Sequence, residues 1–129
     1  SDLKLLVDKL DIKNKVDFVG FVNNPFSYFF RADVFVLSSI FEGFPNVLVQ
    51  AMSCGLQVIS TNCPGGSREI LSDGKYGYLT EVGDYEQISK RIEDLIIRKP
   101  FKKEKVLNRA KSFDRETAID LFINSLLKN

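Results

Sequence analysis

The chain has 129 residues, of which 44% are hydrophobic and 27% are charged, and its formal net charge is +1. This composition is typical of one soluble domain whose hydrophobic core needs neither disulfides nor metals, and it excludes a two-domain enzyme. Because histidine is absent, imidazole-based catalysis and His-ligated metal sites are excluded too. The balanced charge argues against nucleic acid as a partner.

Neither a membrane span nor a secretory leader is expected. No apolar run approaches the ~20 residues of a bilayer-spanning helix, and the first residues do not resemble a signal peptide. The two cysteines, Cys54 and Cys63, are too few and wrongly spaced for a zinc cluster or a redox motif. We therefore expect reduced thiols and a cytoplasmic protein.

A helical pattern opens the chain, with no strand before it. Its apolar residues recur at helical spacing and are Leu3, Leu6, Val7 and Leu10. A β-rich run predicts a first strand over residues 16–19, and residues 25–31 predict a helical stretch. Residues 33–37 predict a second strand that is apolar on both faces, as a central parallel strand is.

Helices and strands alternate through the middle of the chain. Pro45 suits the first position of a helix that stops at Gly55, and Ser67 suits the cap of a short helix. Third and fourth strands are predicted over residues 58–60 and 77–79. A helix over residues 85–97 is predicted to face inward with Ile88, Ile92, Leu95 and Ile96. This alternation predicts the α/β class, with a Rossmann-like, doubly wound parallel sheet covered on both faces.

Two more helices are predicted at the end of the chain, over residues 102–112 and 116–127. The last carries an apolar stripe of Ile119, Phe122, Ile123, Leu126 and Leu127. An uncovered stripe of this kind predicts self-association.

A basic stretch precedes this last helix. From Arg98 to Lys111 there are seven basic residues against the single acidic Glu104. Two interpretations stay open, a solvated helix face and a patch that faces anionic lipid headgroups at the inner membrane surface.

The order of these elements bears on domain organisation. A doubly wound domain normally begins with a strand and its phosphate-facing turn, whereas this chain begins with a helix. We therefore interpret residues 1–129 as one domain without its first strand or strands, and we expect an N-terminal part of the same protein upstream.

The segment after the second strand is the first candidate for a ligand site. Ligands of open α/β sheets bind beyond the carboxyl ends of the strands, and here residues 38–46 lead into the helix over 47–53. Gly43 lets the backbone approach a ligand, and the free amides at the start of a helix favour phosphate. Taken alone, this pattern occurs in many strand-loop-helix units.

A longer string adds specificity. Residues 42–60, Glu-Gly-Phe-Pro-Asn-Val-Leu-Val-Gln-Ala-Met-Ser-Cys-Gly-Leu-Gln-Val-Ile-Ser, resemble the donor-binding segment of the retaining family-4 glycosyltransferases. That segment is marked by a glutamate, seven residues and a second glutamate. The similarity continues in residues 18–22, 32–39, 64–71 and 74–79.

The resemblance implies a fold and an activity. The family has the B-type glycosyltransferase fold, with two Rossmann-like domains and the active site in the cleft between them. Residues 1–129 resemble most of the second domain, which binds the nucleoside-diphosphate sugar, with a uracil base expected. The implied reaction is sugar transfer to an acceptor with retention at the anomeric carbon and without a required metal or other cofactor.

The resemblance also carries site residues onto this chain. Glu42 matches the first glutamate, which in the family contacts the donor sugar. A run of backbone positions is implied to face the diphosphate, namely Gly43, Phe44, Pro45, Asn46 and Val47. Phe21 and Val22 are implied to lie against the base.

One position departs from the family pattern. The second glutamate of the motif is replaced by Gln50, and an amide offers one acceptor oxygen where a carboxylate offers two. Ribose binding is therefore expected to be weaker, and a surface residue in a protein that has lost activity stays an alternative.

The family's diphosphate-binding arginine and lysine would lie upstream of Ser1. Arg68 is the one arginine in a loop that follows a strand, and we expect it to pair with Glu69 or Asp73 on the surface. The aromatic cluster Phe26, Tyr28, Phe29 and Phe30 is expected to pack in the core. Cys54 is expected to face the core, and Cys63 to be a loop thiol near the cleft.

Two function classes follow. The first is the donor-binding domain of a glycosyltransferase in polysaccharide or glycoconjugate biosynthesis, and this chain by itself is then expected to transfer no sugar. The second is a non-catalytic nucleotide- or anion-binding module that kept the fold, with Gln50 as its support. The enzyme hypothesis rests on the residue-by-residue motif, because fold alone does not imply function.

Overall fold

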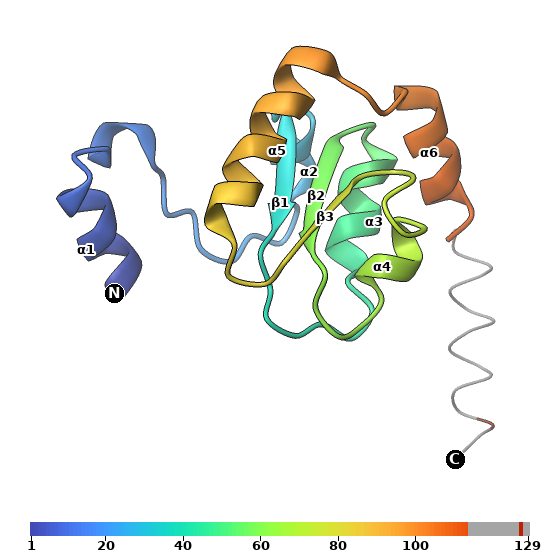
Figure 1. The fold of residues 1–129 in the computed structure, drawn as a ribbon, viewed down its shortest axis with the longest axis horizontal. Helices are drawn as coiled ribbons and strands as arrows, with labels where there is room; N and C mark the ends of the chain where they lie inside the picture. Colours follow the sequence, from blue (N-terminus) through green and yellow to red (C-terminus); the bar gives the residue numbers. More distant parts are fainter. Residues whose placement is uncertain (114–126, 128–129) are drawn as a thin grey trace.

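The computed structural model describes residues 1–113 and Leu127 of the chain (Figure 1). The predicted helix over residues 116–127, with its apolar stripe, lies outside the described residues except for Leu127. The elements in chain order are α1 (Asp2–Lys9), the 3-10 turn η1 (Lys13–Lys15), α2 (Phe26–Phe29), β1 (Val34–Leu37), α3 (Asn46–Ser53), β2 (Gln57–Thr61), α4 (Ser67–Ile70), β3 (Tyr78–Thr80), α5 (Tyr85–Arg98) and α6 (Lys103–Lys111).

Three parallel strands form the sheet in the order β1-β2-β3. Val36 lies opposite Ile59 in the register of the first pair, and Ser60 lies opposite Leu79 in that of the second. Helix α5 packs against all three strands, whereas α3 contacts β1 and β2 and is itself covered by α6. Figure 1 shows α5 and α3 on opposite sides of the sheet. The predicted α/β class with a parallel sheet covered on both faces is confirmed.

The core lies between β2 and α3. Leu48 and Met52 of α3 are fully buried, as is Val58 of β2, and all three belong to one cluster. Burying one such side chain stabilises a fold by about 1.5–3 kcal/mol relative to leaving it exposed. Val106 of α6 closes the outer side of this cluster, so the terminal helix of the described chain belongs to the core.

The strand β1 is an edge strand among the described residues, where the sequence predicted a central one. It pairs with β2 on one side, and all four of its residues, Val34–Leu37, are only half-buried. An apolar strand at an edge leaves backbone donors and acceptors and part of its side chains uncovered. The strand therefore carries more apolar side-chain surface than the described residues around it bury.

The predicted strand over residues 16–19 is wrong, because these residues form no regular element. A strand needs ladder hydrogen bonds to a neighbour, and no described strand lies beside this segment. Phe18 and Val19 are exposed, and the ammonium of Lys4 lies 5.8 Å from the Phe18 ring centroid. The β-rich composition alone does not produce a strand here.

The predicted first helix is confirmed, but its apolar face is uncovered. Ser1 caps α1 by accepting a hydrogen bond from the amide of Lys4 at 3.4 Å. None of its residues is buried, and Leu3, Leu6 and Leu10 are exposed. Figure 1 shows α1 standing apart from the sheet at the end of an extended segment. No part of the described chain therefore buries the apolar face of α1.

Several predicted boundaries and inward positions change. The N-cap of α4 is Gly66, so Ser67 is its first residue and not its cap. Pro45 is likewise the N-cap of α3 and not its first residue. In α5, Leu95 is buried as predicted, whereas Ile96 is 52% exposed.

The aromatic and cysteine predictions hold in part. Phe29 is buried and packs edge-on against Phe35 at 5.5 Å between ring centroids. Its neighbours Phe26, Tyr28 and Phe30 are exposed, so their assignment to the core is wrong. A four-residue helix turns only one aromatic face inward. Both cysteines are free, with Cys54 half-buried against the core and Cys63 buried.

None of the helices that the structure describes is long and apolar enough to cross a membrane.

Candidate functional site

Two loops meet at the carboxyl ends of β1 and β2. The first, residues 38–45, leads from β1 into α3, and the second, residues 62–66, leads from β2 into α4. Their backbones are joined by two hydrogen bonds, from Glu42 N to Pro64 O at 3.1 Å and from Gly66 N to Gly43 O at 2.7 Å. The two loops therefore form one rigid rim at the edge where ligands of parallel sheets bind.

Glycine is required at the point of closest approach. A Cβ atom on Gly65 would lie 1.8 Å from the carbonyl oxygen of Glu42 and 2.8 Å from that of Gly43. The φ angle of Gly65 is also +131°, in a region that L side chains rarely adopt. Gly65 thus lets the second loop lie directly against the backbone of Glu42.

The side chain of Glu42 is also fixed. The hydroxyl of Ser39 donates a hydrogen bond to Glu42 Oε2 at 2.6 Å. Thr61, at the end of β2, donates from its hydroxyl to the carbonyl of Ser39 at 2.5 Å. The sequence pointed to Glu42 but to neither Ser39 nor Thr61. The contact between Thr61 and Ser39 spans 22 residues, and the one signal in the sequence was the place of both residues just after two predicted strands.

The start of α3 supplies free backbone donors. Among the described residues, the amides of Gly43, Phe44 and Val47 donate to no other protein group. The amide of Asn46 is taken by the carbonyl of Phe44 at 2.9 Å, and Pro45 has no amide hydrogen. The predicted run of five positions therefore retains three donors. Together with the positive end of the α3 dipole, these donors favour an anion at the rim.

Gln50 lies on the helix that these amides begin. It follows Asn46 by one turn of α3, which corresponds to about 6 Å along the helix axis. Its side chain is half-buried, while its carbonyl accepts a hydrogen bond from the Ser53 hydroxyl at 2.6 Å. Among the described residues, no group forms a hydrogen bond with the side-chain amide of Gln50, so this amide can contact a ligand that extends from the helix start.

Phe21 and Val22 lie in the segment before α2. The Phe21 side chain is 91% exposed and Val22 is half-buried. A phenyl ring in water is a ready surface for stacking. No hydrogen bond in the described chain links this pair to the two loops, so the structure does not by itself join them to the rim.

Arg68 forms the predicted surface pair with Asp73. The hydrogen bond that Arg68 donates to Asp73 and the opposite charge of that carboxylate raise the pKa of Arg68. Both side chains are exposed, so the pair is a surface feature. The expected surface role of this arginine is confirmed.

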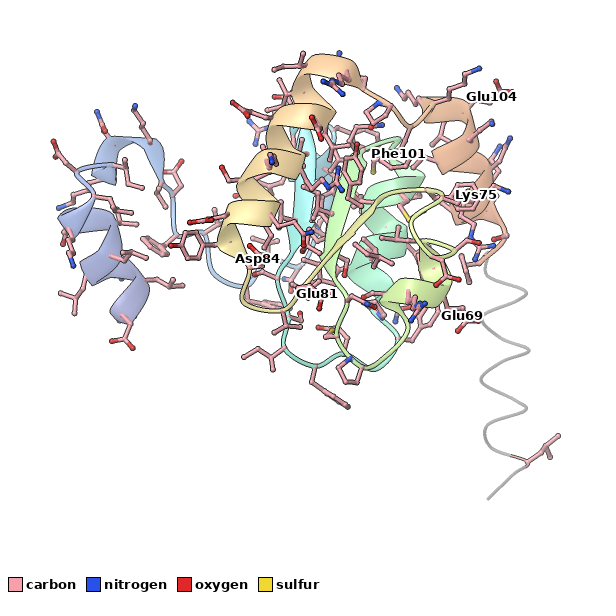
Figure 2. All side chains as sticks on the ribbon, viewed as in Figure 1. Glu69, Lys75, Glu81, Asp84, Phe101 and Glu104 are labelled. Atoms are coloured by element: carbon pink, nitrogen blue, oxygen red, sulfur yellow. The ribbon has the colours of Figure 1, made fainter. Side chains whose placement is uncertain are left out.

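Part of the basic stretch has a structural role that the sequence did not reveal. Arg109 donates to the carbonyl oxygens of Ile70 at 2.9 Å and of Glu69 at 2.7 Å. Its guanidinium also lies 4.8 Å from the Phe113 ring centroid. Arg109 thereby holds α6 against the end of α4, in the region where Figure 2 labels Glu69 and Lys75.

Three other basic residues, Lys99, Lys102 and Lys103, lie at the opposite end of the sheet from the rim, near the start of β2. Figure 2 shows Phe101 and Glu104 at that end and Glu81 near the carboxyl end. A hollow of about 500 Å³ opens beside them and is lined in part by Lys99, Lys102 and Lys103. All three lysines are exposed, which both interpretations of the basic stretch predict.

Comparison with known proteins gives the family context of this rim. Residues 1–113 match the family described as "Glycosyl transferases group 1". A similar characterised protein is the N-acetylgalactosamine-N,N'-diacetylbacillosaminyl-diphospho-undecaprenol 4-alpha-N-acetylgalactosaminyltransferase of Campylobacter jejuni. It is 36% identical over 119 residues, which are 89% of this chain and 32% of that protein. The chain therefore spans about a third of the length of this relative.

Solved structures agree with the sequence comparison. Anabaena HepE in complex with UDP-glucose is 26% identical, with a TM-score of 0.85 over 99% of this chain and 36% of that one. The sucrose-phosphate synthase of Thermosynechococcus elongatus, at 24% identity, shares the fold with a TM-score of 0.82 over 98% of this chain and 33% of that one. The three-stranded parallel sheet and its helices are thus part of a B-type glycosyltransferase domain. The match over residues 1–113, the 36% identical relative and the rim built around Glu42 lead to one conclusion: this chain belongs to the glycosyl transferases group 1 family.

Proposed function

We propose that this chain is the donor-binding domain of a glycosyltransferase that moves a sugar from a uridine-diphosphate sugar to an acceptor with retention of configuration. The observation that carries the proposal is the rim itself, where three free amides at the start of α3 lie next to the fixed carboxylate of Glu42. The amide donors suit a diphosphate, and the carboxylate acceptor suits sugar hydroxyls. The complex of HepE with UDP-glucose supports this class of ligand.

The chemistry follows from the positions of these groups. During transfer, the bond between the anomeric carbon and the diphosphate oxygen breaks, a bond from that carbon to the acceptor oxygen forms, and the proton of the acceptor hydroxyl passes to the departing diphosphate. Negative charge then develops on the departing diphosphate, next to the amides of Gly43, Phe44 and Val47. Oriented donors at such a position typically raise the rate by about 10²–10³ each. Glu42 holds the sugar by accepting hydrogen bonds from its hydroxyls.

Gln50 and the exposed Phe21 complete the proposed donor site. Gln50, one turn along α3, is placed to contact the ribose with one acceptor and two donors. Phe21 and Val22 lie against the base once the nucleotide binds. This assignment of Gln50 predicts weaker ribose binding than a glutamate would give.

A titration tests the proposed site directly. UDP and UDP-glucose are titrated into the protein that carries residues 1–129, with binding followed by calorimetry. We expect both to bind, with Glu42→Gln weakening UDP-glucose and leaving UDP little changed. Binding of both ligands without any transfer to acceptors by the full-length protein would favour the non-catalytic module that Gln50 suggests. Absence of binding by either ligand would refute the site.

We propose further that residues 1–129 form one domain of a larger protein, whose N-terminal part binds the acceptor. Support comes from the uncovered faces of α1 and β1 and from the length of the curated relative. The isolated chain is then expected to transfer no sugar. A coupled assay for UDP release, with the chain and with the full-length protein, tests this expectation, and transfer by the chain alone would overturn it.

The acceptor is proposed to be a glycoconjugate intermediate in the cytoplasm, at the inner face of a membrane. The Campylobacter jejuni relative is named for an acceptor carried on diphospho-undecaprenol. The exposed Lys99, Lys102 and Lys103 offer a surface for anionic headgroups, each contributing about 1 kcal/mol near the bilayer. Flotation with phosphatidylglycerol vesicles tests this surface. Changing Lys99, Lys102 and Lys103 to Gln should abolish flotation. Changing the three N-terminal lysines Lys4, Lys9 and Lys13 to Gln, which removes the same charge, should not.

A further inference from the structure

We propose that Ser39 is a positioning residue for the carboxylate of Glu42, and that Thr61 holds Ser39 in place. The inference rests on the proposed function of Glu42 as the donor-sugar contact. The Thr61 hydroxyl bonds the backbone carbonyl of Ser39, and the Ser39 hydroxyl bonds the Glu42 carboxylate. Together these two bonds connect the end of β2 to the Glu42 side of the rim.

The first link is a short hydrogen bond to a charged group. Ser39 Oγ lies 2.6 Å from Glu42 Oε2, and both residues are half-buried. Hydrogen bonds to ionised acceptors are stronger and more directional than neutral ones. Within the described residues the second oxygen, Oε1, receives no donor, so it stays available to a ligand hydroxyl. The Ser39 contact therefore selects one orientation of the carboxylate and leaves half of it free.

The second link fixes the serine to the sheet. Thr61 is 2% exposed, and its hydroxyl lies 2.5 Å from the carbonyl of Ser39 and 3.4 Å from that of Leu37. These carbonyls belong to the last residue of β1 and to the loop beyond it. Thr61 thus ties the beginning of the loop to the neighbouring strand.

The backbone of Glu42 is held by a different set of contacts. Its amide donates to Pro64 O at 3.1 Å, and Gly65 lies against its carbonyl. Removal of the Ser39 hydroxyl leaves these backbone contacts intact. The position of Glu42 and the direction of its carboxylate are therefore controlled separately, and a change at Ser39 alters only the direction.

This separation gives the test. A carboxylate that is free to rotate spends less time in the orientation that binds the sugar, and the apparent affinity falls with that fraction. We expect Ser39→Ala to weaken UDP-glucose binding by about tenfold, the scale of one charged hydrogen bond. UDP has no hexose, so its affinity should change less than twofold. A general loss of loop structure would instead weaken both ligands, because the diphosphate amides follow Glu42 directly.

Two variants complete the design. Ser39→Thr keeps the hydroxyl and should restore UDP-glucose binding to within about threefold of the unchanged protein. Ser38→Ala makes the same chemical change one residue earlier, at an exposed side chain that forms no hydrogen bond with Glu42 in the described chain, and should leave both affinities unchanged. In the background of Glu42→Gln, Ser39→Ala should have little further effect, because the carboxylate that it directs is gone.

The outcomes separate this inference from the proposed function. If Glu42→Gln weakens UDP-glucose while Ser39→Ala does not, Ser39 does not position the carboxylate and the inference fails alone. If Ser39→Ala weakens UDP and UDP-glucose equally, its role is structural and the inference fails as well. If the unchanged protein binds neither UDP nor UDP-glucose, both the proposed function and the inference about Ser39 are refuted. Selective loss of UDP-glucose in both variants supports both.

Discussion

The substitution Gly65→Ala tests whether the rim depends on direct backbone contact. The added Cβ atom would lie 1.8 Å from the Glu42 carbonyl oxygen and 2.6 Å from the carbonyl carbon. Both atoms belong to the backbone, so no flexible side chain can move out of the way. The loops must either stay and bear the strain or separate.

Each route has an approximate free energy. Staying in place combines a strained backbone conformation, of about 1–3 kcal/mol, with overpacking of about 1–3 kcal/mol. Separation breaks the hydrogen bonds Glu42 N to Pro64 O and Gly66 N to Gly43 O, at about 1 kcal/mol each. The protein takes the less costly route, so we expect a loss of roughly 2 kcal/mol. For a protein of this size that lowers the Tm by about 10 °C.

Thermal unfolding followed by circular dichroism measures this loss, and calorimetry with UDP-glucose measures the site. Gly83→Ala is the matched control, because Gly83 also has a positive φ, +82°, but nothing lies within 4 Å of its Cβ position. It should lower the Tm by only a few degrees and leave UDP-glucose binding intact. Equal Tm shifts for the two variants, or full UDP-glucose binding by Gly65→Ala, would refute the idea that the two loops form one rigid rim.

Four further predictions follow from single contacts. In Gly43→Ala the added Cβ atom has no protein atom within 4 Å, so the Tm should stay unchanged. The affinity for UDP, measured by calorimetry, should fall severalfold, and an unchanged affinity would mean that the diphosphate binds elsewhere. Thr61→Val removes a buried, bonded hydroxyl, whereas Thr80→Val removes a buried hydroxyl with no partner among the described residues; chemical denaturation should show about 1 kcal/mol lost in the first variant only. Gln50→Glu should strengthen UDP relative to its 2′,3′-dideoxy analogue, because a carboxylate bonds the ribose hydroxyls more strongly; equal changes would move Gln50 away from the ribose. Asp73→Asn breaks a pair whose side chains are 65% and 71% exposed, so the Tm should not change measurably at physiological salt.

Local patterns in the sequence were sufficient to predict the helices and the class of fold. The period of apolar residues predicted α1 and α5, and Gly55, with a φ of +74°, marked the end of α3. These features depend on residues within one or two turns of each other, which is why a linear pattern reveals them. The motif that begins at Glu42 belongs to the same category, because its residues are consecutive on one loop and one helix.

Tertiary structure decided which apolar segments pair in the sheet or pack in the core. Residues 16–19 have the composition of a strand and α1 has an apolar face, yet in the described chain the segment joins no sheet and no residue of α1 is buried. Strand formation depends on ladder bonds to a second segment, and composition does not say whether that segment is present. For the same reason β1 reads as a central strand in the sequence and lies at the edge of the sheet.

The site shows the same division at the level of single residues. The sequence by itself determined that Glu42 and the start of α3 follow a strand, and that Gln50 lies one turn further along. Only the folded chain brought Thr61 to Ser39, Gly65 to Glu42 and Arg109 to the end of α4. These contacts join residues 22, 23 and 39 positions apart, and no periodicity relates them. They arise because parallel pairing of β1 and β2 brings the carboxyl ends of both strands to one edge, where their loops must pack against each other.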